Sequence, residues 1–408
     1  MTVAVNVLAE ATFLGSAHHR DWLRTQADRQ FGFFSNALNP KGGFFQLAVD
    51  GTPLPEQAQE LHATARMVHS FALATKLGRK GAAEMVDHGM RALWHLHRDP
   101  LHGGYVWAVD GRAVTDGRKL AYGHVFVLLA AASAMEVGHP DAVRLMRDVL
   151  EVLEEHFWEE GSGLYRDEWN RDWTPFSTYR GMNANMHGAE ALLAAHEATG
   201  EAVHLERAGR ILDTFTARIA PAEGWRIPEH YSEDWQIDRA YSGNPMFRPA
   251  GTTPGHSFEF ARLLLQWWDL SGRRGDAPGR ARALAQQAMA DAWLPDTGGI
   301  AYTLDFEGRV AIADRYWWPV TEAIGTVAML LKADPREGDE DWYRALWHFA
   351  EAHFIDHARG GWFPEIGADG KPVSTIFTGK PDIYHSIQAA LFPLTSGVSR
   401  HFAQIGVI

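Results

Sequence analysis

The sequence predicts an all-α protein, an (α/α)6 barrel in which six helical hairpins close into a double ring. Two observations predict this fold. First, a short motif recurs six times, a small residue followed by glycine and an aromatic or apolar residue; we call it the glycine phrase. Second, polar and apolar helical stretches alternate, one before and one after each glycine phrase. A fixed period of roughly sixty residues is typical of an array of like units. The phrases begin at Gly42-Gly43-Phe44, Gly103-Gly104-Tyr105, Gly161-Ser162-Gly163, Gly224-Trp225, Gly298-Gly299-Ile300 and Gly360-Gly361-Trp362.

A polar, amphipathic stretch precedes each phrase, and we expect it to form an outer helix. In the third such stretch Leu150, Leu153 and Phe157 fall on one face at helical spacing. The six expected outer helices span residues 19–38, 81–97, 140–158, 201–219, 279–294 and 341–355.

A more apolar stretch follows each phrase, and we expect it to form an inner helix. These stretches are apolar nearly all round, as a helix covered on both sides should be. Four of them end on a glycine placed as a C-cap, namely Gly78, Gly138, Gly200 and Gly272. The six expected inner helices span residues 56–77, 122–137, 183–199, 256–270, 319–331 and 383–394.

Six helical hairpins either stack into an open solenoid or close into a ring. An open solenoid needs polar caps, and no capping helix is expected after the final apolar stretch 383–394. Closure therefore explains the pattern better. No Pro/Ser-rich linker, charge block or low-complexity segment divides the chain, so we expect residues 1–408 to form a single catalytic domain.

Composition excludes several classes of function. The formal charge of -13 disfavours nucleic acid and anionic membrane surfaces as partners. No apolar run reaches membrane-spanning length, and the N-terminus lacks the pattern of a signal peptide. The absence of cysteine excludes disulfides, a thiolate nucleophile and thiolate metal sites. We expect a cytoplasmic protein, and the oligomeric state stays open, a homo-oligomer included.

Polar residues stand near the start of every expected inner helix. In a closed ring these starts share one mouth, where six helix N-termini favour developing negative charge. Singly, each histidine is more often a hydrogen-bonded core residue, and His69, His124 and His196 are assigned to that class. The coincidence in all six repeats favours a shared site. The residues are His62, Arg66, Tyr122, Asn183, His187, His256, Glu259, Trp318, Glu322, Asp382 and His385.

Imidazoles outnumber clustered carboxylates in this set, which favours proton transfer near neutral pH. No phosphate-binding loop, Gly-x-Ser-x-Gly elbow or His-Glu-x-x-His motif is present. His256 and Glu259 have the spacing of metal ligands on a helix, with His187 or His385 as a third ligand. We favour a site without metal, because the carboxylates do not cluster in sequence. Aromatic walls with Asn, Arg and His donors suit a sugar.

Five motifs resemble the N-acylglucosamine 2-epimerase superfamily, in order and over nearly the whole chain. The longest is the stretch 248–259, Arg-Pro-Ala-Gly-Thr-Thr-Pro-Gly-His-Ser-Phe-Glu. The others cover residues 64–67, 183–187, 317–322 and 380–385. The resemblance is closest to the aldose–ketose isomerase branch, which contains mannose and sulfoquinovose isomerases. It implies the (α/α)6 barrel and no metal or redox cofactor.

The resemblance also implies roles for individual residues. His256 and His385 would be the acid/base pair, and Glu259 would orient His256. Arg66 would bind sugar oxygens near the reacting carbons. One residue departs from the family pattern, because His62 stands where several relatives have an aromatic residue, and this leaves sugar stacking there open. The remaining expected substrate-binding residues are Tyr122, Asn183, His187, Arg248, Trp318, Glu322 and Asp382.

The expected reaction interconverts an aldose and its 2-ketose, with mannose and fructose as the first choice. We expect His385 to move the proton between C2 and C1, and His256 to serve ring opening and proton movement between O1 and O2. Arg66, His187 and the helix N-termini would stabilise the enediolate oxygen. Three alternatives stay open at this point: a sugar 2-epimerase, a sulfoquinovose isomerase, and a glycoside hydrolase that would need two flanking carboxyl groups. A sugar-binding protein without turnover would leave the histidine pair unexplained.

Overall fold

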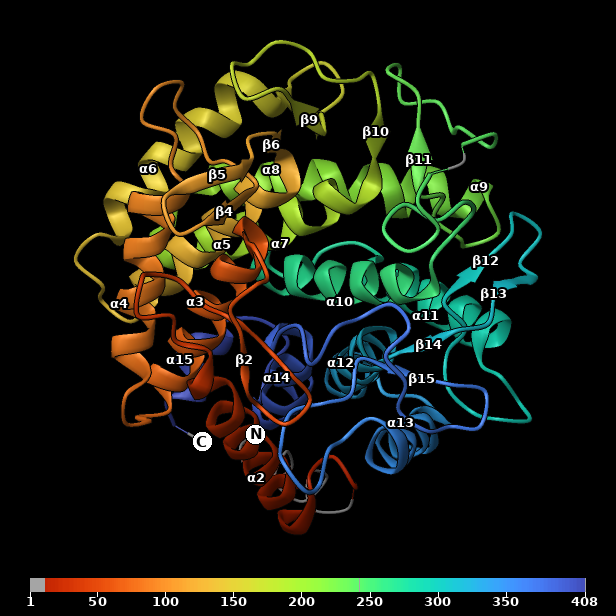
Figure 1. Ribbon diagram of the computed structural model, residues 1–408. Coiled ribbons are helices and arrows are strands. Elements are labelled where there is room, and N and C mark those ends of the chain that lie inside the picture. Colours follow the sequence, from red (N-terminus) through yellow and green to blue (C-terminus); the bar gives the residue numbers. More distant parts are fainter. Residues whose placement is uncertain (1–11, 242, 408) are drawn as a thin grey trace.

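The computed structural model describes residues 12–241 and 243–407, and its helices form two concentric rings (Figure 1). The predicted (α/α)6 barrel is therefore confirmed. The inner ring consists of α3 (Leu61–Lys76), α5 (Ala121–Glu136), α7 (Met182–Thr199), α10 (Pro254–Leu270), α12 (Trp317–Ala333) and α14 (Tyr384–Leu391). The outer ring consists of α2 (Ala17–Phe34), α4 (Ala82–Ala92), α6 (Ala142–Val152), α8 (Ala202–Asp213), α11 (Ala277–Ala292) and α13 (Asp339–His353).

The two rings differ in burial as their polarity predicts. Helix α12 is buried without a break from Trp317 to Leu330. Helix α13 outside it starts with acidic residues and buries mainly one side. Helices α4, α6 and α8 end in wider π-helical turns, Leu93–His97, Leu153–Phe157 and Thr214–Ile219. A helix between two layers must be apolar on both faces, whereas an outer helix needs only one apolar stripe.

Four of the six inner helices end on glycines, as the sequence predicts. Gly78 has φ +71°, a left-handed conformation that costs glycine little. The amide of Gly78 donates to the Thr75 carbonyl, and the amide of Arg79 donates to the Ala74 carbonyl. These two bonds satisfy carbonyls that the helix end would leave free. Gly138, Gly200 and Gly272 also have positive φ.

The recurring glycine phrases form tight turns between an outer and an inner helix. At Gly104 φ is +64°, and a Cβ atom there would lie 2.6 Å from the ring of Trp173. A buried lysine supports this turn, because Lys119 bonds the Gly103 carbonyl and lies 3.5 Å from Asp99. Lys380 supports the sixth turn in the same way, through the Gly360 carbonyl at 2.6 Å. The phrases therefore mark the points where the chain turns back toward the centre.

A circle of backbone hydrogen bonds closes the ring. At the start of each inner helix, an amide donates to a carbonyl of the following repeat, and the sixth repeat bonds back to the first. The bonds run from Leu61 to Trp107, Ala121 to Asp167, Met182 to Glu229, Thr252 to Leu304, Trp317 to Pro364 and Lys380 to Leu47, at 2.8–3.2 Å. All six inner helices therefore begin on the same side of the ring.

Short antiparallel strands lie next to these bonds, a feature that the all-α prediction did not include. They lie in the connections between helices. The strands are β1 (Gln46–Leu47), β2 (Pro53–Leu54), β3 (Gln59–Glu60), β4 (Ala108–Asp110), β5 (Ala113–Asp116), β6 (Lys119–Leu120), β7 (Trp158–Glu159), β8 (Leu164–Tyr165), β9 (Glu168–Trp169), β10 (Arg180–Gly181), β11 (His230–Tyr231), β12 (Thr303–Leu304), β13 (Val310–Ile312), β14 (Arg315–Tyr316) and β15 (Glu365–Ile366). Four pairs join neighbouring repeats, namely β3–β4, β6–β9, β10–β11 and β14–β15. The pairs β1–β2, β4–β5, β7–β8 and β12–β13 are hairpins within one connection.

Two expectations about the helices are wrong. The first inner helix starts at Leu61 rather than at residue 56, because the residues before it form a turn and strand β3. A short helix, α15 (His401–Ile405), follows the sixth inner helix and packs against α3, although no helix was expected there. Because α15 rests on the first repeat, it covers the junction between the two ends of the ring. A three-residue helix, α9 (Ala220–Ala222), and two 3-10 turns, Ser35–Ala37 and Phe392–Leu394, complete the helical elements.

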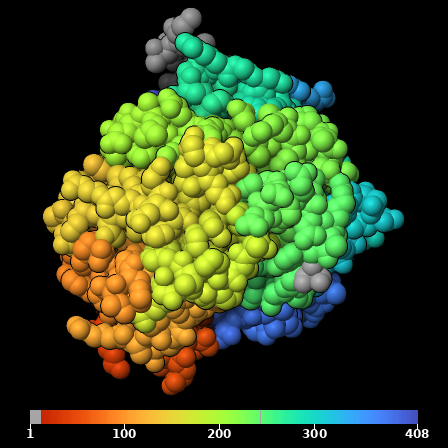
Figure 2. Space-filling view, turned by 90° about the horizontal axis from the view of Figure 1, so that it is seen from above, coloured from red at the N-terminus to blue at the C-terminus, as the bar shows by residue number. Residues whose placement is uncertain are grey.

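The loops of the third and fourth repeats lie side by side on the face seen in Figure 2, in yellow and green. The pairing of β10 with β11 joins them. Across the described part of the chain, no helix has both the length and the apolar character needed to cross a bilayer.

Candidate active site

Three imidazole–carboxylate pairs lie near the starts of the inner helices. His256, at the start of α10, places Nδ1 2.8 Å from Oε1 of Glu229. His385, at the start of α14, places Nδ1 2.8 Å from Oε1 of Glu322 on α12. Because a carboxylate only accepts, each imidazole donates its Nδ1–H, which fixes the tautomer and supports a positive charge on the ring.

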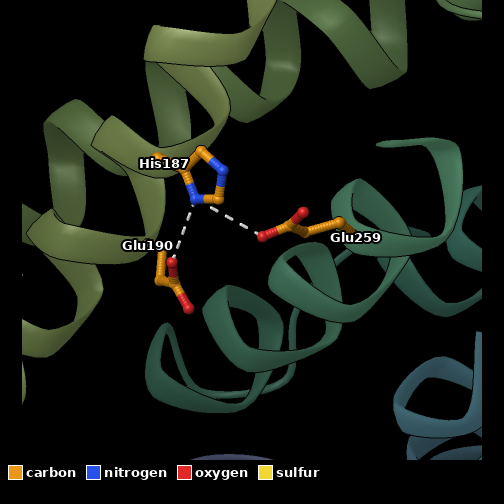
Figure 3. A group of neighbouring side chains, drawn as sticks. All are labelled: His187, Glu190 and Glu259. Carbon is orange, nitrogen blue, oxygen red and sulfur yellow. Dashed lines mark hydrogen bonds and ion pairs between the residues drawn. The ribbon is translucent and has the colours of Figure 1, made fainter. Parts of the chain in front are cut away.

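The third pair is His187 with Glu190 on α7 (Figure 3). Nδ1 of His187 lies 3.3 Å from Oε2 of Glu190 and 3.5 Å from Oε1 of Glu259. Burial lowers the pKa of His187 to about 4, so this ring is neutral at neutral pH.

The second ring nitrogens of the three histidines are open. No group within residues 12–241 and 243–407 bonds Nε2 of His187, His256 or His385, and none of these atoms is sealed from solvent. By contrast, both ring nitrogens of His69 and of His124 have protein partners. The core assignment of His69 and His124 is therefore confirmed, whereas three other histidines present a free proton acceptor. His196 is only partly buried, so its core assignment is wrong.

Arg262 lies at the centre of the carboxylates. Its guanidinium contacts Glu322 at 3.0 Å, Glu259 at 3.4 Å and Glu190 at 3.5 Å. Burial opposes the charge of Arg262, but Glu322 and the other two carboxylates raise its pKa. Arg262 is 1% exposed, and it is not among the residues that the sequence analysis singles out.

The three carboxyl groups differ in their titration. Burial and the charge of Glu322 raise the pKa of Glu259 well above its ordinary value. Burial would also raise the pKa of Glu190, but the hydrogen bond from His187 and the charge of Arg262 hold it below its ordinary value. The pKa of Glu322 is lowered too, because Arg262 and His385 outweigh burial. At neutral pH, Glu190 and Glu322 are ionised, whereas the surroundings of Glu259 favour its protonated form.

Arg66 on α3 bonds a residue of α5 and a residue just before α14. It donates to Asp382 at 2.8 Å and to the Tyr122 hydroxyl at 2.8 Å. Its guanidinium also lies 4.7 Å from the ring centre of Tyr384. Burial opposes its charge, but Tyr122 and Asp382 raise the pKa of Arg66, so a fixed positive charge stands beside the histidines.

Aromatic rings form the walls of the site. Trp318 packs beside both catalytic candidates, with ring centres 4.9 Å from His256 and 5.9 Å from His385. His62 stacks on Trp107 with ring centres 5.0 Å apart and planes inclined by 6°. Trp107, from the next repeat, thus supplies an aromatic ring at the wall where several relatives have an aromatic residue in place of His62. Burial lowers the pKa of His62 well below its ordinary value, so this ring is neutral.

Arg248 and Asn183 are the most peripheral of the expected residues. Arg248 pairs with Glu168 at 2.8 Å and lies 4.0 Å over the ring of Tyr179. Glu168 is paired across β6 and β9 with Leu120, so Arg248 stands above the start of α5. Asn183, in the first turn of α7, has an amide oxygen without a partner in the described part of the chain.

One expected contact is wrong. Glu259 was expected to orient His256, one helical turn earlier, but the structure gives that position to Glu229. Glu259 instead faces His187 and Arg262. Glu229 precedes β11 and lies outside every helix, so helical periodicity could not reveal it. Glu190 and Arg262 could have been found, since each stands three residues after an expected site residue on the same helix.

Two groups of side chains have the geometry of metal ligands, His187 with Glu190 and Glu259, and Glu259 with Glu322 and His385. However, Arg262 contacts the carboxylates of both groups. Its positive charge already neutralises these carboxylates and would repel a metal cation. The imidazole nitrogens that face these carboxylates are the Nδ1 atoms, which carry a proton and donate it to the carboxylates. They have no lone pair left for a metal. The donor set therefore does not fit a divalent ion.

Comparison with known proteins gives consistent matches. The family model described as N-acylglucosamine 2-epimerase (GlcNAc 2-epimerase) matches residues 42–389. The D-mannose isomerase of Thermobifida fusca is 41% identical over 403 residues, covering 96% of this chain and 98% of that protein. The D-mannose isomerase of Pseudomonas cannabina pv. alisalensis is 38% identical over 394 residues, covering 94% of each. A crystal structure of a D-mannose isomerase superposes with TM-score 0.87 at 32% identity, covering 92% of this chain and 97% of that one.

Proposed function

The chain belongs to the N-acylglucosamine 2-epimerase family, and we propose that it is the member that interconverts D-mannose and D-fructose. It is a sugar isomerase, as its similarity to D-mannose isomerases indicates. One observation supports proton transfer by two histidines as the chemistry of this site. His256 and His385 flank Trp318, each fixed by a carboxylate at 2.8 Å and each with an open Nε2.

The proposed reaction starts from the ring form of the aldose. A proton moves from O1 to O5 as the ring opens. His385 then removes the proton on C2 with Nε2, and the electrons of that C–H bond form the C1=C2 bond of a cis-enediolate. His385 returns the proton to C1, while His256 moves the remaining proton between O1 and O2. Glu322 and Glu229 support the positive charge that each imidazole carries in turn.

The enediolate oxygens need stabilisation while the negative charge is present. Arg66 supplies a fixed positive charge, and the N-termini of α3, α5, α7, α10, α12 and α14 point toward the same mouth. We assign sugar binding to Tyr122, Asn183, His187, Trp318 and Asp382, with His62 on Trp107 as a further wall. Arg248 is assigned to the rim. Glu259 contacts His187 and Arg262, so we assign it to the support of these two side chains rather than of His256.

The rival functions make different demands on the site. A 2-epimerase needs proton donors on both faces of C2, and it would convert mannose to glucose rather than to fructose. A sulfoquinovose isomerase needs a free cation for the sulfonate, and Arg248 is already paired with Glu168. A glycoside hydrolase needs two available carboxyl groups, but Glu259 and Glu322 both contact Arg262.

We also propose that residues 1–408 form one catalytic domain that works in the cytoplasm on a monosaccharide without a cofactor. The charge of -13 supports the exclusion of nucleic acid and of anionic membranes. The oligomeric state stays open.

The function is tested by incubating the purified protein, without added metal, with mannose, glucose, fructose, sulfoquinovose and N-acetylmannosamine. Products are separated by chromatography. Fructose from mannose, and mannose from fructose, are the expected products. Mannose that gives glucose with little fructose would identify a 2-epimerase instead.

A further inference from the structure

The proposed isomerisation leaves one imidazole–carboxylate pair without a proton to transfer. His385 acts on carbon and His256 on the two oxygens of the enediolate. His187 is built in the same way, with a carboxylate on Nδ1 and an open Nε2, yet isomerisation at C2 does not require a third base.

The surroundings of this pair hold it in one geometry. The His187 ring lies 4.6 Å from that of Phe126 and 5.4 Å from that of Tyr122, between centres. Glu190 accepts a hydrogen bond from the Tyr384 hydroxyl and lies 3.5 Å from Arg262. Both side chains are less than 10% exposed.

The same surroundings keep His187 in its neutral form, which can accept a proton. Burial lowers the pKa of His187 to about 4, and the hydrogen bond from His187 and the charge of Arg262 hold the pKa of Glu190 below its ordinary value despite burial. Since ionised Glu190 can only accept, Nδ1 of His187 carries the proton and Nε2 carries a lone pair. A neutral ring with a free lone pair takes a proton from a hydroxyl group, but it cannot donate one to an oxyanion. This differs from the oxyanion-stabilising role expected for His187 from the sequence.

We propose that the protein is also a mutarotase: it interconverts the α and β anomers of its aldose, in an activity separable from isomerisation, with His187 and Glu190 as the base. The proposal rests on the proposed function in one respect, that the aldose binds at this mouth.

The transfers balance without any net proton or electron. The proton on O1 passes to Nε2 of His187, and the electrons of the O1–H bond form the C1=O1 carbonyl as C1–O5 breaks. O5 takes a proton from the imidazolium form of His256, which Glu229 supports. Rotation about C1–C2 presents the other face of the carbonyl. Closure then reverses both transfers, so O5 attacks C1 while O1 regains its proton from His187.

The test uses a sugar that opens its ring but cannot become a ketose. 2-Deoxy-D-glucose has no hydroxyl group on C2, so wild-type enzyme can exchange only its anomers. Freshly dissolved α-anomer is followed by polarimetry and by proton NMR in dilute buffer. We expect the enzyme to accelerate the approach to anomeric equilibrium by at least ~10-fold over buffer. Failure to do so, while mannose still gives fructose, would overturn the proposal and leave the proposed function intact.

Variants then assign the activity to residues. With D-mannose, His385→Asn should lose fructose formation but keep anomer exchange. Glu190→Gln and His187→Asn should each lower anomer exchange by at least ~10²-fold, the usual contribution of one acid–base group. The matched control is His196→Asn, at the far end of the same helix, which should leave exchange unchanged. Circular dichroism confirms that each variant is folded.

Three outcomes are distinguishable. If His385→Asn loses exchange together with fructose formation, the two activities are not separable and the proposal is wrong. If both His187→Asn and Glu190→Gln keep full exchange, the assignment of the base is wrong. If wild-type enzyme gives neither exchange nor fructose, the proposed function itself fails.

Discussion

Glu229 lies 2.8 Å from Nδ1 of His256, although 27 residues separate them in the chain. The main-chain carbonyl of Glu229 also accepts the amide of Met182 at the start of α7. The residue that orients His256 is thus part of the hydrogen-bond circle that closes the ring. The segment that contains Glu229 therefore both closes the ring of helices and orients His256.

This contact predicts that Glu229→Gln lowers turnover by roughly 10²-fold or more, within the range of one acid–base group. The amide keeps the size of the side chain but no longer supports a charged imidazole. Initial rates of fructose formation from mannose give the measurement. Glu233→Gln, an exposed carboxylate in the same segment, is the control and should keep its rate. A Glu229→Gln enzyme with wild-type turnover would show that this bond does not serve catalysis.

The carboxyl groups around Arg262 predict opposite effects of two similar substitutions on stability. Glu190 is ionised and bridges His187 and Arg262, so Glu190→Gln should lower the free energy of unfolding by ~3 kcal/mol, as for a broken buried ion pair. The surroundings of Glu259 favour its protonated form, so Glu259→Gln should cost less than ~1 kcal/mol. Urea titration at pH 7 measures both. Equal losses would mean that Glu259 is ionised in the folded protein.

Buried neutral histidines predict that stability falls with acidification below pH 6.5. Burial lowers the pKa of His124 to about 3 and that of His69 to about 4. Between the folded pKa and the ordinary value of about 6.5, the unfolded chain binds protons that the folded chain does not. Stability is therefore complete above pH 6.5 and is lost as the pH falls toward 4.

A replacement already present in the next repeat tests this effect. Asn185 takes the place of His124 there, and it accepts the amide of Tyr165 as His124 accepts that of Tyr105. His124→Asn should therefore keep the fold and reduce the slope of unfolding free energy against pH between 6.5 and 4. An unchanged slope would show that His124 does not contribute to acid sensitivity.

Arg262 predicts that activity survives removal of metal ions. Its contacts with Glu190, Glu259 and Glu322 place a positive charge where a divalent cation would bind. We expect full turnover after exhaustive dialysis against EDTA. Loss of turnover, followed by recovery on addition of one divalent ion, would instead favour a metal held by Glu259, Glu322 and His385.

The fold could be predicted from the sequence because its signals are local and repeated. Each glycine phrase forms a turn, Gly78 and Gly138 end helices through their own φ angles, and the burial of each helix follows its polarity. The short strands could not be predicted in this way. Each has only two to four residues, and the pairs β3–β4, β6–β9, β10–β11 and β14–β15 join segments about fifty residues apart, in neighbouring repeats.

The site was predictable only where its residues lie on helices. His256, His385, Arg66 and Glu322 stand near helix starts, where periodicity brings them to one mouth. Whether Glu259 faces His256 or His187 depends on the packing of α10 against α7, which spacing along one helix does not reveal. The position of Glu229 depends on the ring closure itself, since a loop of the fourth repeat carries it to His256.

The central claim is that an imidazole moves a proton between C2 and C1 of one sugar. It is tested most directly by converting D-mannose in heavy water and analysing the products by NMR. The account predicts fructose as the main product and neither product with His385→Asn. To the extent that the proton held by His385 exchanges with solvent, fructose gains deuterium at C1 and mannose formed from fructose gains it at C2. Glucose carrying deuterium at C2, with little fructose, would contradict the account, because the proton would then return to the opposite face of C2.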